Sequence, residues 1–407
     1  MEETPKGSRL HIAIFGRRNA GKSSLINALT SQDIALVSDV PGTTTDPVYK
    51  AMEILPIGPV MIIDTAGIDD VGDLGALRVE RTMQVLNKTD LAVMVIEPEQ
   101  GVTEFEKELV KAIRKRKLPI AGVINKSDLL SISPEQLAQW SVEIDVPLIG
   151  ISAKTGQGIE ELKRLMIKLA PDDWEGPPLI GDLVSPGDTV VLVVPIDLAA
   201  PKGRLILPQV QTIRDILDND ACAVVVKERE LKEALAGLKQ PPHLVVTDSQ
   251  EFMKVGADTP PGVMLTSFSI LLARHKGDLE TLVTGAKAID SLEPGDKVLI
   301  AEGCTHHRQA DDIGKMKIPR WLRQNVGGEL EFEWVSGGTF PPDLTKYKLI
   351  VHCGGCMLNR REMLYRLATA REAGVPIVNY GLLIAHLHGI LHRALAPFPL
   401  AQMILTE

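Results

Sequence analysis

The hydrophobic positions of residues 11–170 form short apolar, β-branched runs that alternate with helical patterns. A first helical pattern at 23–29 follows the first run, and the runs predict strands at 11–15, 60–63, 91–96, 120–124 and 147–151. Regular alternation of this kind is typical of a parallel sheet covered by helices on both faces. We therefore expect residues 1–172 to form one α/β domain.

A second alternating region follows a short linker. The segment Pro171–Pro178 is acidic and rich in turn formers, which indicates a boundary between domains. Residues 178–262 then show strand patterns at 189–194, 221–226 and 243–246. So small a unit would leave the edges of its sheet open, and pairing with a second copy would cover them. We interpret this region as a dimerisation domain.

The alternation resumes over residues 263–407 and predicts a third domain. Strands are expected at 297–301, 329–334, 348–351 and 376–380, with a helical return between each pair. The 407 residues are too many for one hydrophobic core and suit two or three domains. The predicted fold is α/β with three domains, each a largely parallel sheet with flanking helices.

The composition of the chain indicates the cellular compartment and excludes some classes of partner. The net charge of −9 provides no basic field for phosphate backbones, so nucleic acid is not expected as a partner. The longest apolar run, Val190–Ala200, contains Pro195 and Asp197 and is far shorter than a membrane span. The polar segment Met1–Arg9 resembles neither a signal peptide nor a transit peptide. With only four cysteines, we expect a reduced, cytoplasmic protein without membrane contact.

A phosphate-binding loop joins the first predicted strand to the first predicted helix. The segment Gly16-Arg-Arg-Asn-Ala-Gly21-Lys22-Ser23 has the spacing in which backbone amides cradle phosphates at a helix N-terminus. Lys22 is expected to reach the β- and γ-phosphates, and the Ser23 hydroxyl to bind Mg²⁺. The residues expected to line this part of the site are Gly16, Asn19, Ala20, Gly21, Lys22, Ser23 and Ser24.

Two further segments complete the predicted magnesium and γ-phosphate site. Asp64 follows an apolar run and would place a carboxylate near the metal ion, while the amide of Gly67 would sense the γ-phosphate. A run of three threonines precedes them and offers a second hydroxyl ligand, for which we choose Thr44, with Thr43 and Thr45 as alternatives. The residues expected to carry hydrolysis are Lys22, Ser23, Thr44, Asp64 and Gly67.

Two more motifs predict a pocket for guanine. In Asn125-Lys126-Ser127-Asp128, the carboxylate of Asp128 can accept hydrogen bonds from N1–H and from the 2-amino group of guanine. Adenine lacks both donors, so the expected ligand is GTP. The segment Ser152-Ala153-Lys154 would present backbone amides to the guanine oxygen.

These motifs resemble those of the translation-factor-related GTPases, and most closely the potassium-activated group that includes the tRNA-modification GTPase MnmE and Era. The resemblance implies that Asn19 ligates K⁺ beside the phosphates, where a monovalent cation would stabilise the transition state. The alternative is that Asn19 merely caps the loop. The residue after Gly67 is Ile68 and not a water-orienting glutamine, so we expect slow hydrolysis by the isolated chain.

Three of the four cysteines lie in two short clusters, Cys304-Thr-His306 and His352-Cys353-Gly-Gly-Cys356. Each cluster follows a predicted strand, and loops at the carboxyl ends of parallel strands meet at one edge of the sheet. Zinc on three thiolates and one imidazole is one interpretation. Glycine-rich, amide-rich surroundings favour an iron–sulfur cluster. The fourth cysteine, Cys222, is expected to be a small buried residue in a strand.

The whole chain resembles the HydF family of FeFe-hydrogenase maturation GTPases. The cluster motif of that family is Cys-x-His, a long spacer and His-Cys-x-x-Cys, and it is matched here by Cys304, His306, His352, Cys353 and Cys356. The resemblance implies a 4Fe-4S cluster on three thiolates with a labile fourth position, so that residues 263–407 form the cluster-binding domain. For the fourth position we choose His352, and the alternatives are His306, Asp311, Asp312 or water.

The resemblance also implies a role and partners. The protein would be a homodimeric scaffold that receives the diiron precursor of FeFe-hydrogenase from two radical-SAM maturases and transfers it to the apo-hydrogenase. We expect GTP to regulate the exchange of partners through a conformational change, because the two motifs lie in separate domains. The alternative is a potassium-activated RNA-modification or ribosome-assembly GTPase with a structural zinc site, which would need a basic face for RNA.

Overall fold

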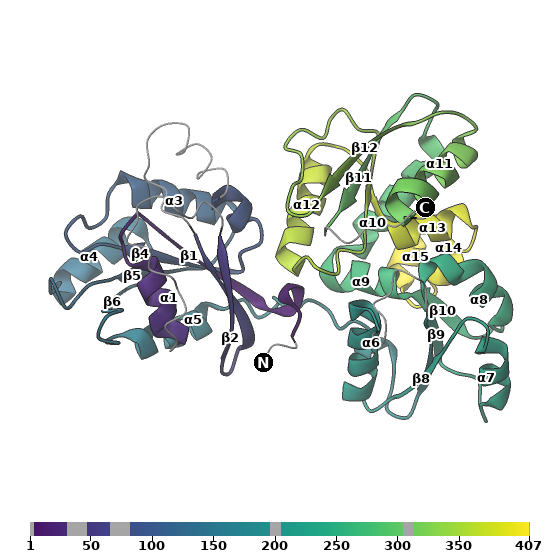
Figure 1. Cartoon of the computed structure of the whole chain (residues 1–407), viewed down its shortest axis with the longest axis horizontal. Coiled ribbons are helices and arrows are strands. Elements are labelled where there is room, and N and C mark those ends of the chain that lie inside the picture. The colour runs from purple at the N-terminus through teal and green to yellow at the C-terminus, as the bar shows by residue number, and fades with distance from the viewer. Residues whose placement is uncertain (1–3, 31–46, 66–81, 196–204, 304–311, 407) are drawn as a thin grey trace. The chain divides into compact units, whose positions relative to one another are not determined.

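The computed structural model describes residues 4–30, 47–65, 82–195, 205–303 and 312–406 (Figure 1). The chain divides into two compact units, Met1–Glu175 and Gly176–Glu407. Three sheets are described, one in the first unit and two in the second. The predicted α/β class with largely parallel sheets is confirmed.

The first unit contains a six-stranded sheet in the order β2-β3-β1-β4-β5-β6. Only β2, at the edge, runs antiparallel to its neighbour. The strands are β1 (Leu10–Gly16), β2 (Val48–Ile54), β3 (Gly58–Asp64), β4 (Leu91–Ile96), β5 (Ile120–Ile124) and β6 (Leu148–Gly150). The helices are α1 (Lys22–Thr30), α3 (Glu104–Lys115), α4 (Pro134–Ile144) and α5 (Ile159–Leu169).

Helices cover both faces of this sheet because side chains alternate along each strand. In β1, Ile12 and Ile14 belong to a cluster that includes Leu25 of α1 and Leu162 of α5. The intervening residues of β1 belong to a second cluster, with side chains of α3 and α4. The phosphate-binding loop therefore lies between a strand and a helix that are both anchored in a dry core.

The second unit begins with a four-stranded parallel sheet in the order β10-β9-β7-β8. Its strands are β7 (Thr189–Val193), β8 (Cys222–Val226), β9 (Leu244–Thr247) and β10 (Met264–Ser267). Its helices are α6 (Leu207–Asp218), α7 (Leu231–Gly237) and α8 (Phe252–Asp258). Because β10 pairs with β9, this sheet extends beyond the predicted boundary at residue 262, which falls in the turn before β10.

The other sheet of the second unit has the order β12-β11-β13-β14 and is parallel throughout. Its strands are β11 (Lys297–Glu302), β12 (Glu331–Ser336), β13 (Leu349–His352) and β14 (Ile377–Asn379). The helices are α9 (Phe268–Lys276), α10 (Leu279–Lys287), α11 (Ile318–Val326), α12 (Arg360–Glu372), α13 (Tyr380–Leu387), α14 (Leu391–Ala394) and α15 (Pro399–Thr406). Short 3₁₀ turns are η1 (Lys6–Ser8), η2 (Gly181–Leu183), η3 (Ser249–Glu251) and η4 (Ala288–Ser291), and η5 (Ile313–Lys317) is a π-helix.

The two sheets of the second unit share one hydrophobic cluster. Val191 of β7, Leu271 of α9 and Ile300 of β11 all belong to it. This continuity explains why three sheets form only two compact units. Within the described part of the chain, no helix is both long enough and apolar enough to cross a bilayer.

The prediction that Cys222 is buried is wrong. Cys222 is exposed in β8, which is an edge strand with a mostly open outer side. Val225 of the same strand is 45% exposed. An apolar edge strand of this kind is the feature that pairing with another copy would cover.

Candidate functional site

The phosphate-binding loop has the backbone that its sequence predicts. Gly16 and Gly21 have φ of +151° and +90°, and a Cβ on Gly21 would lie 2.2 Å from the side-chain nitrogen of Asn125. The Nζ of Lys22 donates to the carbonyls of Gly16 and Arg17, at 3.0 and 2.7 Å. Lys22 is the first residue of α1, so its ammonium lies at the helix N-terminus, where phosphates bind.

Ser23 and Asp64 meet at the predicted magnesium position. The hydroxyl of Ser23 donates to one carboxylate oxygen of Asp64 at 2.7 Å. The other oxygen of Asp64 is buried and has no hydrogen-bond partner among the described residues. Burial raises the pKa of Asp64, and the Ser23 hydrogen bond and the charge of Lys22 act in the opposite direction. A hydroxyl beside an unpartnered carboxylate oxygen is a donor set that fits Mg²⁺.

The residues of the predicted guanine pocket are brought together. The side chain of Asn125 donates to the carbonyl of Ala20 and accepts from the amide of Ala153, each at 3.0 Å. The hydroxyl of Ser152 donates to Asp128 at 2.7 Å. The base-binding segments are therefore tied to one another and to the phosphate-binding loop.

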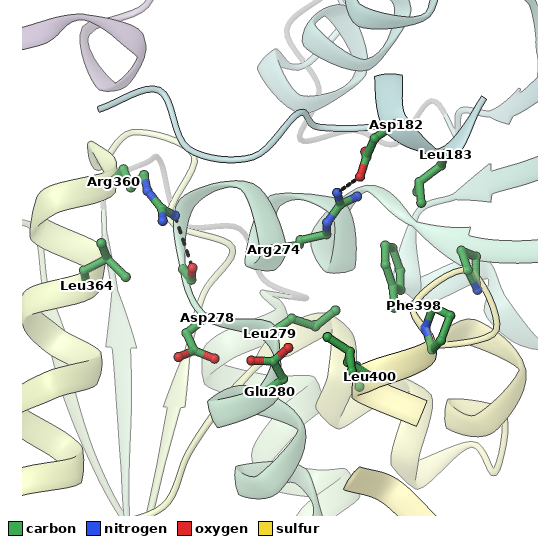
Figure 2. Close-up of a pocket in the computed structure, with 14 residues that line it drawn as sticks. Asp182, Leu183, Arg274, Asp278, Leu279, Glu280, Arg360, Leu364, Phe398 and Leu400 are labelled. Atoms are coloured by element: carbon green, nitrogen blue, oxygen red, sulfur yellow. Dashed lines mark hydrogen bonds and ion pairs between the residues drawn. The ribbon is translucent and has the colours of Figure 1, made fainter. Parts of the chain in front are cut away.

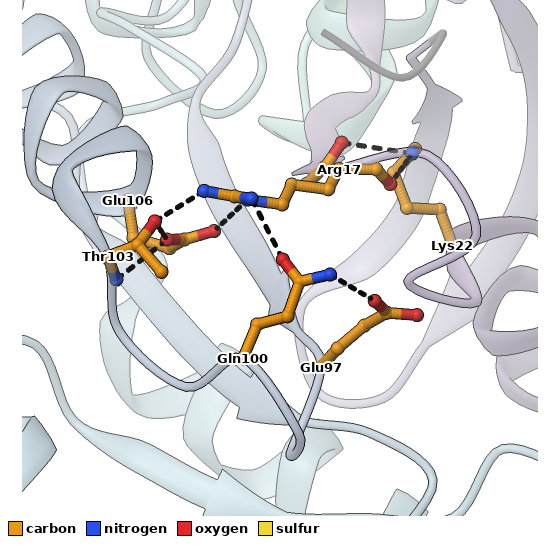
Figure 3. Close-up of polar contacts among 7 residues, drawn as sticks. Arg17, Lys22, Glu97, Gln100, Thr103 and Glu106 are labelled. Atoms are coloured by element: carbon orange, nitrogen blue, oxygen red, sulfur yellow. Dashed lines mark hydrogen bonds and ion pairs between the residues drawn. The ribbon is translucent and has the colours of Figure 1, made fainter. Parts of the chain in front are cut away.

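Arg17 fixes the phosphate-binding loop to the start of α3, a role that the sequence did not predict. Its guanidinium donates to Glu106 at 3.2 Å, to Gln100 at 2.8 Å and to the hydroxyl of Thr103 (Figure 3). Glu106 is 2% exposed and also accepts from the amide of Thr103, as the capping box of α3. The network therefore joins the loop to a buried carboxylate.

Five more of the predicted GTPase residues are Asn19, Lys126, Lys154, Thr44 and Gly67. Asn19 is exposed in the loop, with φ of 62°, and Lys154 lies in the turn after β6. Lys126 forms an ion pair with Glu97 at 2.5 Å. Thr44 and Gly67 lie outside the described residues.

At the carboxyl end of β13, Cys353 is held by backbone amides. Its sulfur accepts from the amides of Gly303 and Gly355, at 3.0 and 3.4 Å. Burial raises the pKa of the Cys353 thiol, while these two hydrogen bonds lower it. Gly303 directly precedes Cys304, so the chain leading to Cys304 runs beside Cys353.

The glycines between Cys353 and Cys356 have a backbone role. Gly355 has φ of +62°, a conformation that other residues rarely adopt. Only a Ser269 oxygen at 3.7 Å would be near a Cβ on Gly354. Amide-to-sulfur hydrogen bonds and a turn with little side-chain bulk fit the surroundings of an iron–sulfur cluster.

His352, our first choice for the fourth ligand position, has both ring nitrogens engaged by the protein. Nε2 lies 3.0 Å from the guanidinium of Arg366, and Nδ1 lies 2.7 Å from the carbonyl of Cys353. A guanidinium can only donate, so Nε2 accepts and Nδ1 donates. Burial and then the charge of Arg366 lower the pKa of His352 to about 3, so the ring is neutral. Ligation of iron by His352 would require Arg366 to leave, which is a physical argument against this choice.

Cys304, His306 and Asp311 lie outside the described residues. Asp312 is described, and its side chain caps η5 by accepting from the amide of Lys315 at 2.9 Å. Among the residues that the structure describes, no group of three or more potential metal ligands gathers at one point. The convergence of the three thiolates therefore stays a prediction.

Two polar residues, one buried and one partly buried, border this loop and were not predicted as site residues. Lys276 of α9 is 2% exposed and points its ammonium at the loop between Cys353 and Asn359. Tyr380 donates to Glu302, the last residue of β11, at 3.3 Å, and burial raises the pKa of Tyr380 well above its ordinary value. Lys276 belongs to no recognisable local motif, and Tyr380 lies in the segment Asn379-Tyr-Gly381, which is one of those that resemble the HydF family.

A separate pocket opens beside the last turn of α9 (Figure 2). Arg274 pairs there with Asp182 and stacks over the ring of Phe398, whose centroid is 5.6 Å away. Arg360, also at the pocket, donates to the carbonyl of Gly277 at 3.2 Å. None of the residues predicted for the nucleotide or cluster sites lines this pocket.

Three models of known protein families match successive parts of the chain. Residues 179–277 match the hydrogen maturase F dimerization domain, and residues 280–397 match the hydrogen maturase F tetramerization domain. Residues 11–126 match a family described as 50S ribosome-binding GTPase.

The similar curated proteins resemble the first unit. The tRNA modification GTPase MnmE of Heliobacterium modesticaldum is 36% identical over 161 residues, which are 39% of this chain and 34% of that protein. GTPase Der of Kosmotoga olearia is 34% identical over 172 residues, 40% of this chain and 39% of that protein. The chain thus spans about a third of the length of the curated relatives it matches. Among solved structures, Era of Aquifex aeolicus has 21% identity and a TM-score of 0.37, covering 61% of this chain and 99% of that one.

Proposed function

We infer that this chain, which belongs to the hydrogen maturase F family, is a GTP-hydrolysing scaffold that carries a 4Fe-4S cluster for the maturation of FeFe-hydrogenase. Two hydrogen maturase F models together match more than half of the chain, and a GTPase model precedes them. The observation that carries the proposal is the environment of Cys353, whose sulfur accepts from two amides, one of them directly before Cys304.

GTP hydrolysis is proposed for the first unit. Ser23 and Asp64 would hold Mg²⁺, with Thr44 as the second hydroxyl ligand, and the bound ion would neutralise charge on the β- and γ-phosphate oxygens. Lys22, whose ammonium is held by two loop carbonyls, would stabilise the charge that grows on the phosphates. The amide of Gly67 would respond to the γ-phosphate.

Two further roles are proposed at the edges of this site. Asp128, positioned by Ser152, would accept from N1–H and the 2-amino group of guanine. Asn19, exposed in the phosphate-binding loop, would ligate K⁺ as in the potassium-activated GTPases. A potassium-dependent rate in an otherwise unchanged buffer would support the second role, and equal rates in K⁺ and Na⁺ would contradict it.

The cluster is proposed to bind Cys304, Cys353 and Cys356, with an exchangeable group at the fourth position. When bound, a cluster of this kind supplies an open iron site that an exogenous ligand can occupy and leave. Since the nitrogens of His352 are engaged, His306, Asp311, Asp312 or water are the better choices for the fourth position. The chain itself contributes amide hydrogen bonds to sulfur, which tune cluster potentials.

The assembly is proposed to be a homodimer built on the sheet that ends in β8. Family models named for dimerization and tetramerization support oligomerisation of the chain. The exposed edge of β8, with Val225 and Cys222 open, has the unpaired backbone that a second copy would satisfy. We further propose a cytoplasmic protein that receives the diiron precursor from radical-SAM maturases and delivers it to apo-hydrogenase.

Activation of separately expressed apo-hydrogenase tests the proposal. The chain, purified after co-expression with the maturases, should activate apo-hydrogenase, and the Cys353→Ala variant should not. Lys22→Ala should abolish GTP hydrolysis while iron and sulfide content per chain stay unchanged, because the two sites lie in separate units. Loss of both properties in Lys22→Ala would contradict this separation.

Metal analysis separates the proposal from its main alternative, a ribosome-assembly or RNA-modification GTPase with structural zinc. After anaerobic reconstitution, we expect iron and inorganic sulfide in equal amounts and little zinc. Stoichiometric zinc without sulfide, together with tight binding of RNA, would favour the alternative.

A further inference from the structure

Lys276 is a buried lysine whose ammonium is wholly engaged by the loop that carries Cys353 and Cys356. Its Nζ lies 2.8 Å from the carbonyl of Cys356, 2.8 Å from that of Leu358 and 3.4 Å from that of Gly355. An ammonium has three donors, so these three carbonyls match its full capacity. Lys276 is 2% exposed, whereas a lysine in the last turn of a helix usually extends into water.

The burial of this charge needs a compensating interaction. Taking an ammonium out of water is costly unless charged or strongly polar partners replace the solvent. Burial lowers the pKa of Lys276 to about 8, and negative charge on Cys356 and Cys353 acts to raise it. Three backbone carbonyls replace the water that the ammonium gives up on burial.

The three carbonyls belong to Gly355, Cys356 and Leu358, in the middle and second half of the turn between β13 and α12. The amide of Leu358 donates to the carbonyl of Gly355 at 3.0 Å, which closes the turn, and Asn359 caps α12. Three hydrogen bonds from one rigid helix end therefore fix the path of the turn on both sides of Cys356.

We propose that Lys276 is a positioning residue for the cluster: it fixes the turn that carries Cys353 and Cys356, and it supplies a fixed positive charge beside the bound cluster. This inference rests on the proposed 4Fe-4S cluster. A reductant such as dithionite adds one electron and hence one negative charge to the cluster, and a nearby cation stabilises that reduced form. Lys276 should therefore raise the reduction potential of the cluster.

The variants Lys276→Gln and Lys276→Arg separate charge from hydrogen bonding. Gln is neutral and keeps two donors, whereas Arg keeps the charge. Potentiometric titration of the reconstituted full chain, followed by electron paramagnetic resonance, should show a lower potential in Lys276→Gln. We expect a tenfold shift of the one-electron equilibrium, about 59 mV, with Lys276→Arg close to the unchanged chain.

Lys287→Gln is the matched control. Lys287, in the adjacent helix α10, is exposed and donates to a single carbonyl, that of Ile404, at 3.1 Å. Its replacement removes the same charge without touching the turn, so its potential should stay at the unchanged value. Equal potentials in Lys276→Gln and the unchanged chain, with matching iron and sulfide content, would overturn the inference alone. Absence of iron and sulfide from the unchanged chain would overturn the proposed function and this inference together.

A measurement without variants covers the case in which Lys276→Gln does not fold. Reductive methylation of the folded, metal-free chain, read by mass spectrometry, should modify Lys287 at least tenfold faster than Lys276. Equal rates would mean that the ammonium of Lys276 is not held by the turn, and the inference would fail.

Discussion

Removal of the buried guanidinium of Arg366 should destabilise the second unit. Arg366 is 1% exposed and donates to Nε2 of His352 at 3.0 Å, to the carbonyl of Gly337 at 2.7 Å and to Glu362 at 2.8 Å. In Arg366→Met these three acceptors lose their donor while the apolar stem is largely kept. The perturbation therefore tests the polar contacts and not the packing.

The expected loss follows from the burial of the pair. The side chain of Glu362 is 13% exposed, so it would be left as a mostly buried, unpaired carboxylate. Breaking such a pair costs about 3–5 kcal/mol. For a unit of this size, a loss of about 4 kcal/mol lowers the unfolding midpoint by about 10 °C.

Urea unfolding and calorimetry of the full chain, compared with the Glu362→Gln variant and the double variant, measure this loss. Glu362→Gln should cost less, about 1 kcal/mol, because Gln still offers an acceptor to the guanidinium. The double variant should lose less than the sum of the single losses, since the unpaired carboxylate is then absent. Arg371→Met, at an exposed arginine in the last turn of the same helix, is the control. A loss below about 1 kcal/mol for Arg366→Met, or strict additivity, would show that the pair of Arg366 and Glu362 contributes little to stability.

Three further predictions concern the nucleotide site and the assembly. Burial raises the pKa of Asp64 in the folded chain, so the folded state loses stability as the pH rises above the ordinary pKa of an aspartate. In nucleotide-free calorimetry at pH 7, Asp64→Asn should therefore unfold at a higher temperature than the unchanged chain, and it should lose Mg²⁺-dependent GTP binding. A lower unfolding midpoint would contradict this. Asp128→Asn should weaken GTP binding at least about a hundredfold in calorimetric titration, because two hydrogen bonds to a charged group are lost, whereas Asp173→Asn in the linker should bind normally. Val225→Lys places a charge on the edge strand β8 and should convert the dimer to a monomer in analytical ultracentrifugation. Val142→Lys, at a residue of α4 that is 80% exposed, is the control and should leave the dimer intact. A dimeric Val225→Lys variant would exclude β8 as the interface.

Most strands were predictable from the sequence, including the edge strands β6, β8, β12 and β14, and the two that were missed, β2 and β10, are both edge strands. β4 and β5 match the predicted ranges 91–96 and 120–124 residue for residue, because strands covered on both faces read as unbroken apolar runs. β2 was missed because it is an exposed edge strand with mixed polarity. β10 was missed because it has only four residues directly before α9, which are too few to show the alternating pattern of a strand.

At the two sites, local sequence motifs were predictable and contacts between residues distant in the sequence were not. The loop around Lys22 and the segment around Asp128 are local motifs, so the residues that bind the nucleotide can be recognised from their neighbours in the sequence. Lys276 reaches a turn 80 positions away in the sequence, and a lysine that ends a helix looks like an ordinary partner of the helix dipole. The misplacement of Cys222 has a related cause, because strand periodicity does not reveal which strand lies at an edge.

The last turn of α9 contacts both the segment that enters the second unit and the turn that carries Cys353 and Cys356. The chain enters the second unit at Gly176, where a Cβ would lie 2.5 Å from the carbonyl of His275, so only glycine fits. Nδ1 of His275 donates to the carbonyl of Pro177 at 2.7 Å, and the next residue along the helix is Lys276. Arg360, which begins α12 after the cysteine turn, donates back to the carbonyl of His275 at 3.0 Å. The segment that enters the second unit and the cysteine turn are therefore both held by the last turn of α9.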